Sequence, residues 1–220
     1  KYQLISIDVG VHINGFIGDN ALSIDLSKKN EDLVKASREA LNNAIKIIKH
    51  GITLGEIGEE IQKAITKYGF SPVRNLSGHG LDKFNIHTTP TIPNFNNKDN
   101  TKLEEGQIVA IEPFASKGAG IVYESSNPTV FQLAGKKPTR NPITRNILKE
   151  ISKFQELPFC KRWLTKKFGL PKTNFALREL KQLGILREFP PLIDQAKGLV
   201  SQAEHTILVT KDGCEILTLV

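Results

Sequence analysis

Residues 7–19, IDVGVHINGFIGD, contain the feature that most restricts the fold: an Asn14-Gly15 pair between two apolar, strand-like runs. Asn-Gly is strongly preferred at the centre of a two-residue type I′ turn. Residues 2–11 and 16–25 are therefore predicted to be the two strands of a β-hairpin. The position of the turn also determines which residues face each other across the two strands.

The predicted register places two aspartates side by side. With the turn at Asn14-Gly15, Gly10 pairs with Asp19 and Asp8 pairs with Ala21. Cross-strand partners share a face, as does every second residue along a strand, so a regular hairpin makes Asp8 and Asp19 diagonal neighbours. Such close carboxylates repel unless a proton, an arginine or a divalent metal neutralises them. The alternative, two independent surface or capping aspartates, stays open from the hairpin alone.

The rest of the chain predicts an α+β domain in which helices cover a sheet. One amphipathic helix begins at Asn30-Glu31-Asp32 and ends at Gly51, and Thr53 caps a second helix that ends at Gly69. A strand is predicted at Gln107–Ala115, and residues 203–220 return to strands. The sequence of the intervening segment, 142–190, predicts helices at 143–156, 160–168 and 173–183.

Composition restricts the class of protein only loosely. No run of 18 apolar residues occurs, so no membrane-spanning helix is predicted. Cys160 and Cys214 lie far apart in the chain, which indicates a reducing compartment or no redox role and disfavours a disulfide. The net charge of +7 has two interpretations, a solubilising surface or attraction to an acidic partner such as RNA or a ribosome.

Further polar side chains interrupt apolar segments. His79 and His87 lie in NLSGHGLDKFNIH, which is predicted to be a polar, glycine-rich loop region, while Glu112 and Glu204 lie in the strand-like VAIEPF and SQAEHTILV. A buried glutamate is costly unless it is paired or binds a metal. Each residue taken singly has an ordinary interpretation, an outward-facing strand glutamate or a hydrogen-bonded loop histidine. Together with the two aspartates they predict a convergent site.

At this point the sequence resembles the type II methionine aminopeptidases of peptidase family M24, which have the pita-bread, creatinase-like fold, and it is archaeal-like. The resemblance covers nearly the whole chain. It rests on IDVGVHINGFIGD, NLSGHG, IHTTPTIPN, VAIEPFAS and AEHTILV, and on the order Asp, Asp, His, Glu, Glu. The spacing agrees as well, with ten residues between the aspartates and a second histidine eight positions after the first.

The resemblance implies a dinuclear metal site with two divalent ions, Co, Mn, Fe or Zn. Asp19 and Glu204 match the family's bridging carboxylates. Glu112 also matches the residue that moves the proton, and His87 the imidazole that contacts the scissile peptide. Phe114 and Phe189 match positions that line the pocket for the methionine side chain. The full set of implied ligands is Asp8, Asp19, His79, Glu112 and Glu204.

The resemblance also implies a domain organisation and a cellular role. Residues 1–141 and 191–220 correspond to the catalytic domain, and 142–190 to a helical, winged-helix-like insertion typical of type II enzymes. The implied activity is removal of the first methionine from nascent proteins with a small second residue. The expected location is the cytoplasm, with transient ribosome contact, no membrane or DNA partner, and a monomeric state.

One departure from the family concerns the N-terminus. The family has a further catalytic histidine upstream of the first ligand aspartate, which would precede Lys1. We therefore expect the natural protein to be longer, or a second chain to supply the N-terminal part of the fold.

Two alternatives remain. A non-catalytic pita-bread relative that binds RNA or a ribosome is suggested by the basic residues Lys161, Arg162, Lys166, Lys167 and Lys172. An X-Pro aminopeptidase or prolidase would share the five ligands. The complete ligand set disfavours the first alternative, and the short NLSGHG loop and the helical insertion disfavour the second.

Overall fold

The computed structural model describes residues 3–219, and its contacts divide the chain into two compact units. The first, Lys1–Tyr123 with Ile193–Val220, contains the large sheet and is called the sheet unit. The second, Glu124–Leu192, is called the helical unit. It contains the predicted helical segment 142–190 and a strand at 130–133 that precedes it, and two short strands, at 159–160 and 186–189, lie within the segment that was predicted to be helical.

The predicted hairpin is confirmed. Strand β1 (Leu4–Ile13) pairs antiparallel with β2 (Phe16–Asp25), and the register joins Gly10 to Asp19 and Asp8 to Ala21. The turn residues Asn14 and Gly15 have φ angles of 53° and 93°, as a type I′ turn requires. No bulge interrupts the pairing, so the two aspartates share a face.

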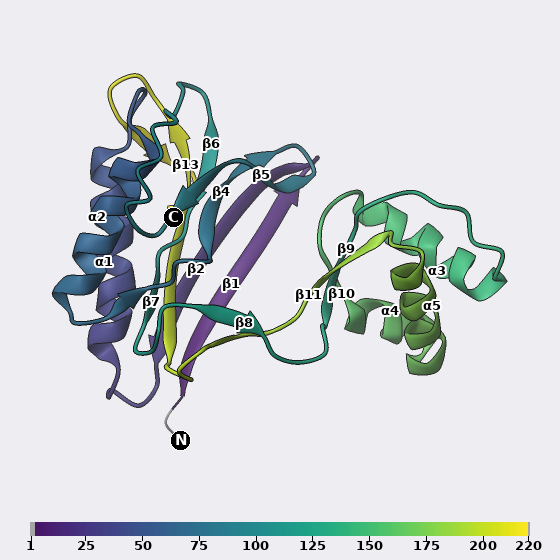
Figure 1. Ribbon diagram of the computed structural model, residues 1–220. Coiled ribbons are helices and arrows are strands. Elements are labelled where there is room, and N and C mark those ends of the chain that lie inside the picture. Colours follow the sequence, from purple (N-terminus) through teal and green to yellow (C-terminus); the bar gives the residue numbers. More distant parts are fainter. Residues whose placement is uncertain (1–2, 220) are drawn as a thin grey trace. The chain divides into compact units, whose positions relative to one another are not determined.

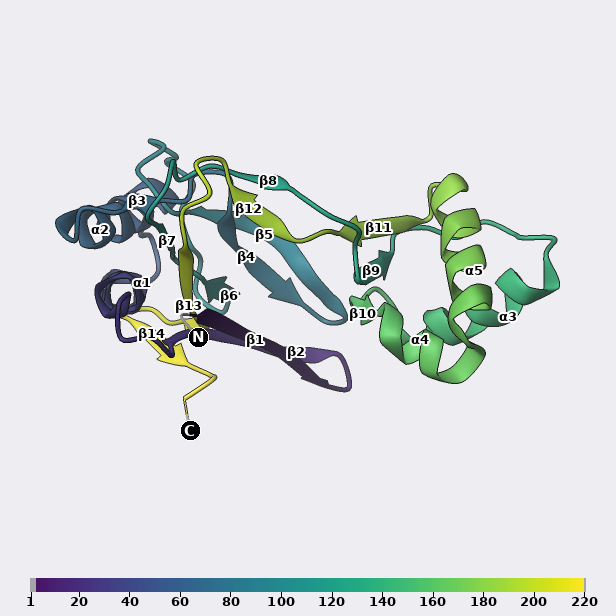
Figure 2. The ribbon, with the colours of Figure 1, turned by 90° about the horizontal axis from the view of Figure 1, so that it is seen from below.

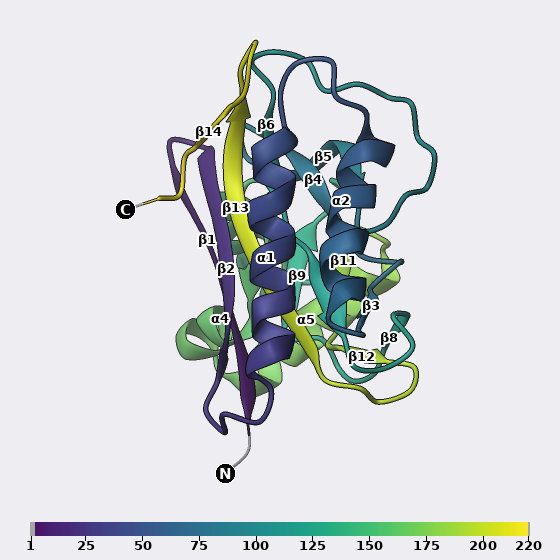
Figure 3. The same ribbon diagram turned by 90° about the vertical axis from the view of Figure 1, so that its left-hand side faces the viewer.

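Two amphipathic helices cover one face of the sheet, as predicted (Figure 1). They are α1 (Glu31–Ile47) and α2 (Leu54–Lys67), which lie side by side in Figure 3. Leu33, Leu41 and Ile57 are buried in the core between the helices and the sheet. Thr53 caps α2 as predicted, and its side chain and that of Glu56 form a capping box.

From β1 and β2, the order across the sheet unit continues with β13 (Val200–Val209), β6 (Ile108–Ile111), β4 (Ser77–Asp82) and β5 (Asn85–Pro93). In Figure 2 they form a layer beside α1 and α2. The predicted strand at 107–115 is interrupted at Glu112-Pro113, because proline cannot donate a ladder hydrogen bond. Off this path lie β3 (Ser71–Pro72) and β14 (Cys214–Ile216), together with β7 (Phe114–Ser116).

The prediction of a polar loop at residues 75–87 was wrong. This segment contains β4 and the start of β5, so His79 and His87 both lie on strands. The glycines that suggested a loop allow close strand contact instead. A Cβ atom on Gly78 would clash with the carbonyl oxygen of Ala110, and one on Gly80 with that of Thr89.

Strand β1 forms one edge of the sheet, paired among the described residues with β2. From Ile5 onward its apolar residues alternate with other residues and are exposed, from 37% for Ile5 to 79% for Ile13. Exposed apolar strands of this kind mark surfaces that bind other polypeptide.

The helical unit has a core of its own, which includes Ile147, Phe159, Leu164 and Leu180. Its helix α3 is shorter than the predicted 143–156, and α5 begins three residues before the predicted 173, after Gly169 with a φ of 80°. The unit contains α3 (Pro142–Ile151), η1 (Ser152–Phe154), α4 (Lys161–Phe168), α5 (Leu170–Gln182) and a sheet of β9 (Val130–Leu133), β10 (Phe159–Cys160) and β11 (Leu186–Phe189).

Two further strands, β8 (Val122–Glu124) and β12 (Leu192–Asp194), pair with each other. Within residues 3–219, no helix is long and apolar enough to cross a membrane.

Candidate metal centre

Six neighbouring strands of the sheet unit contribute one candidate site residue each. Following the order of the strands, these come from β1, β2, β13, the end of β6, β4 and β5. Residues up to 196 positions apart in the chain are thereby brought to one region, since the strand order is not the chain order. In strand order the residues are Asp8, Asp19, Glu204, Glu112, His79 and His87.

The register of β1, β2 and β13 places the carboxylates of Asp8, Asp19 and Glu204 on one face of the sheet. Ala21 pairs with Asp8 on one side and with Glu204 on the other, so these three residues form one row across the sheet. Asp19 lies two residues before Ala21 and therefore on the same face. Ala203 and Ile207 belong to the core under the helices, so Glu204 points to the opposite face. The carboxylates thus gather on the face that α1 and α2 leave free.

The closest group consists of Asp19, His79 and Glu204, which are all buried. Each offers one ligand atom, and the three atoms lie within 4.8 Å of one another. Glu112 extends this group, because its Oε1 lies 3.4 Å from His79 Nε2. The ring of the exposed His87 packs edge-on against that of His79, with centroids 4.5 Å apart.

Burial and mutual repulsion raise the pKa values of the carboxyl groups. Desolvation, followed by the charge of Asp8, raises the pKa of Asp19 to about 6. Desolvation and the charges of Glu112, Asp19 and Asp8 raise the pKa of Glu204 to about 10. Desolvation and the charges of Asp8 and Asp19 raise the pKa of Glu112. Desolvation also raises the pKa of Asp8, although Asp8 as a whole residue is exposed.

This donor set fits a divalent cation. Four carboxylates and one imidazole are hard to intermediate ligands that suit Mn, Fe, Co or Zn. Among the described residues, only the charge of His87 lowers the pKa of one of these carboxyl groups, that of Asp8, and no lysine or arginine is among the causes of the four shifts. Desolvation also lowers the pKa of His79, which favours the neutral imidazole that binds metal. Bound metal would supply the missing positive charge.

Sequence reasoning missed Gln202, which connects two of the candidate ligands. Its Nε2 donates to Asp8 Oδ2 and to Glu112 Oε2, both at 3.2 Å. The side chain is buried, and it projects from the same face as Glu204 because the two residues are two apart on β13. That i, i+2 spacing was the available signal in the sequence.

Two hydroxyl groups fix the backbone beneath these side chains. Ser23 Oγ accepts from the backbone N–H of Gln202 and donates to its carbonyl oxygen, at 2.8 and 2.9 Å. Thr206 Oγ1 does the same for the N–H and carbonyl of Asp19, at 2.8 Å each. Both pairs join β2 to β13, so the relative positions of Asp19, Gln202 and Glu204 are held by side chains as well as by the sheet.

The two predicted pocket residues lie in different units. Phe114 is half-buried on β7 of the sheet unit, and Phe189 lies on β11 of the helical unit. Their role in binding a methionine side chain stays a prediction from the resemblance.

Comparison with known proteins agrees with this arrangement. The model of Metallopeptidase family M24 matches residues 1–211. A methionine aminopeptidase from Archaeoglobus fulgidus is 42% identical over 98% of this chain and 72% of its own length. A solved methionine aminopeptidase from Rickettsia prowazekii has 25% identity and a TM-score of 0.64, over 98% of this chain and 64% of its own.

A further solved structure, a thermophilic Arx1, matches the fold with a TM-score of 0.81 at 19% identity. It covers 97% of this chain, and this chain covers 66% of it. The agreement in sequence, in fold and in a face of convergent carboxylates leads to one classification: this chain belongs to metallopeptidase family M24 and groups with its methionine aminopeptidases.

Proposed function

We propose that this protein removes the N-terminal methionine from nascent proteins whose second residue is small. We further propose that it acts in the cytoplasm as a monomer that contacts the ribosome transiently. The observation that carries the proposal is the row of Asp8, Asp19, Glu204, Glu112 and His79 on adjacent strands, in a chain related to methionine aminopeptidases.

The ligand assignment comes from the resemblance to the methionine aminopeptidases, and the positions of the donors support it. Asp8, Asp19, His79, Glu112 and Glu204 would hold two divalent ions, Co, Mn, Fe or Zn, with Asp19 and Glu204 as the bridging carboxylates. The proximity of Asp19 and Glu204 supports this assignment, because each offers a ligand atom within 4.8 Å of the other and of a ligand atom of His79. When bound, divalent ions polarise the peptide carbonyl group and lower the pKa of water.

Glu112 and His87 are the groups that we assign to proton transfer and charge stabilisation. The raised pKa of Glu112 suits a carboxyl group that must accept and then release a proton. The exposed imidazole of His87 beside His79 can reach a bound peptide and donate a hydrogen bond as charge develops on its carbonyl oxygen. Phe114 and Phe189 are both assigned to contact with the methionine side chain by resemblance only.

The test is cleavage of a Met-Ala-Ser peptide, measured as free methionine released in the presence of Mn²⁺ or Co²⁺. Asp19→Asn removes a bridging charge while keeping the size of the side chain, so we expect the rate to fall at least ~100-fold. Leu208→Val, on β13 but outside the ligand set, should stay within about twofold of the original rate.

Near-normal rates for Asp19→Asn would contradict the dinuclear assignment.

Substrates with proline at the second position separate this activity from that of an X-Pro aminopeptidase. Faster release of alanine from Ala-Pro-Ser than of methionine from Met-Ala-Ser would reject the methionine-specific proposal.

A further inference from the structure

The positive charge of the chain is concentrated in the helical unit. Residues 124–192 contain fourteen Lys and Arg and five Asp and Glu, a net charge of +9. The rest of the chain contains sixteen basic and eighteen acidic residues, a net charge of −2. The overall charge of +7 is therefore a property of one unit.

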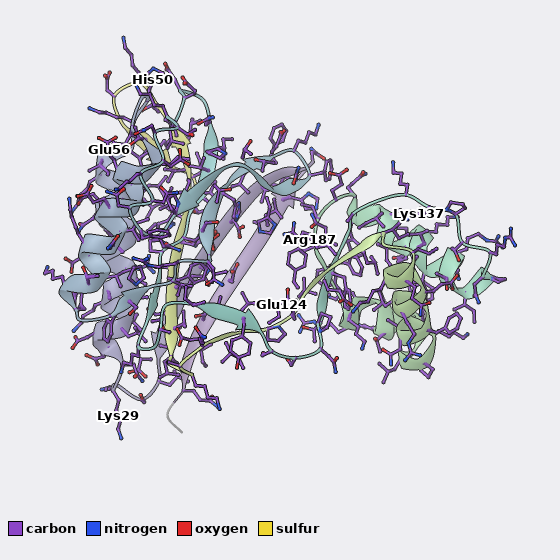
Figure 4. All side chains as sticks on the ribbon, in the orientation of Figure 1. Lys29, His50, Glu56, Glu124, Lys137 and Arg187 are labelled. Atoms are coloured by element: carbon purple, nitrogen blue, oxygen red, sulfur yellow. The ribbon has the colours of Figure 1, made fainter. Side chains whose placement is uncertain are left out.

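Most of these basic side chains have no acidic partner. Glu150 pairs with Lys153 and Lys167, and Glu188 pairs with Lys181. Glu179 instead accepts hydrogen bonds from the hydroxyl groups of two threonines. Among the described residues, the other eleven Lys and Arg of the unit form no ion pair, and Lys137 and Arg187, labelled in Figure 4, are two of them.

The unpaired charge is densest on α4 and α5. Residues 157–178 contain six basic residues and no acidic residue, and within the described part of the chain only Lys167 of the six forms an ion pair. On α4, Leu164 is buried in the core, while Arg162, Trp163 and Lys166 lie on the exposed side. Trp163 is 47% exposed although its ring packs against Phe154.

The exposed side of α5 has the same character. Leu177 and Leu180 are buried, while Lys172, Phe175 and Arg178 are exposed. Phe175 is 49% exposed. Each helix therefore presents basic side chains together with one large aromatic ring.

This combination matches the chemistry of single-stranded RNA. Clustered like charges repel, and a phosphate backbone relieves that repulsion while releasing its own counterions. Exposed aromatic rings stack on unpaired bases whatever the sequence. An anionic membrane is a poorer match, because the apolar sides of α4 and α5 are used in the core of the unit and are not free to enter lipid.

We propose that α4 and α5 form a binding surface for single-stranded RNA, in which Arg162 and Lys166 contact phosphates and Trp163 stacks on a base. This surface belongs to the helical unit alone, and the proposal does not depend on the aminopeptidase activity. It resolves the two interpretations of the net charge in favour of an acidic partner.

Trp163 is the only tryptophan in the chain, so its fluorescence reports directly on this surface. A 20-nucleotide mixed-sequence RNA, labelled with fluorescein, is titrated with the full chain at 50 to 200 mM KCl. We expect quenching of Trp163 and a Kd that rises steeply with salt. The double variant Arg162→Glu/Lys166→Glu should bind at least tenfold more weakly, with a salt slope smaller by about 1.5.

The matched control is Lys49→Glu/Lys211→Glu, which makes the same change in net charge on exposed residues of the sheet unit. It should lose less than threefold in affinity, and far-UV circular dichroism and thermal unfolding matching those of the unsubstituted chain show that each variant is folded. Equal loss in both variants, or binding without quenching, would overturn the proposal. So would tighter binding to phosphatidylcholine vesicles containing phosphatidylglycerol than to the RNA, with the same loss in the α4 variant.

Discussion

At the scale of single residues, the amide group of Gln202 differs from the candidate ligands because it connects two of them by hydrogen bonds. It donates to Asp8 and to Glu112, which lie on opposite sides of β13 in the strand order. A donor that holds two carboxylates fixes their orientation before metal arrives, and such supporting bonds tune metal affinity. Gln202 is thus a positioning residue of the site.

Gln202→Leu should weaken Mn²⁺ binding by about 10- to 100-fold, because both carboxylates lose their shared donor. Isothermal titration calorimetry with Mn²⁺ measures this directly and does not depend on activity. Gln195→Leu, the same change at an exposed position, serves as the control and should bind Mn²⁺ normally. An unchanged affinity for Gln202→Leu would remove the residue from the site.

The crowded carboxylates also predict how stability depends on pH. The pKa of Glu204 is raised to about 10, so the folded chain favours its protonated form, and this contribution to stability is lost as pH rises toward that value. Between pH 7 and 8.5 the free energy of unfolding of the metal-free protein should fall by up to about 1.4 kcal/mol per pH unit. The pKa values of His79 and His205 are lowered, so the protonation of these residues affects stability below this pH range.

Urea unfolding with EDTA at pH 7, 7.5, 8 and 8.5 measures the effect. Glu204→Gln should flatten the dependence, and Mn²⁺ should reverse it by favouring the ionised carboxylates. A metal-free protein that becomes more stable over this range would contradict the raised pKa of Glu204.

At the scale of elements, local signals in the sequence were reliable where they act within a few residues. The Asn14-Gly15 turn and the Thr53 cap were both predicted correctly, since each needs only its neighbours in the chain. The β4–β5 hairpin was not predicted. Gly78 and Gly80 are needed there because the backbones of Ala110 and Thr89 come too close for a Cβ atom, and this contact is visible only once the strands are paired. Glycine in a strand and glycine in a loop look the same in the sequence.

The cap of α2 gives a test at this scale. Thr53 Oγ1 accepts from the backbone N–H of Glu56, while the Glu56 side chain accepts from that of Thr53. Thr53→Ala should lower the free energy of unfolding by about 1 kcal/mol. Chemical denaturation measures this, with Thr66→Ala inside the same helix as the control, expected to change stability by less than about 0.5 kcal/mol. Equal effects of the two substitutions would show that the capping box contributes nothing.

At the scale of the whole molecule, the two units have separate hydrophobic cores. The candidate ligands all lie in the sheet unit, whereas Trp163 lies in the helical unit. Ligand binding stabilises the cooperative unit that contains the site. The two units should therefore respond differently to metal.

We expect two thermal transitions, and Mn²⁺ at 100 times its Kd should raise only that of the sheet unit, by about 2.7 kcal/mol of stability. Calorimetry follows both transitions, and Trp163 fluorescence follows the helical unit. In Asp19→Asn the shift should be largely lost. A single transition that moves as a whole with Mn²⁺ would show that the units unfold together.

The sequence by itself determined the hairpin register, the two covering helices, the α+β class and the resemblance that named the candidate ligands. These depend on local turn chemistry, on periodicity and on spacing along the chain. Only the tertiary structure decided that Glu112 and His79 lie 3.4 Å apart, that Gln202 connects Asp8 to Glu112, and that the basic charge belongs to one unit. The physical reason is that the strand order β1-β2-β13-β6-β4-β5 is set by burial of side chains distant in sequence, which no local pattern specifies.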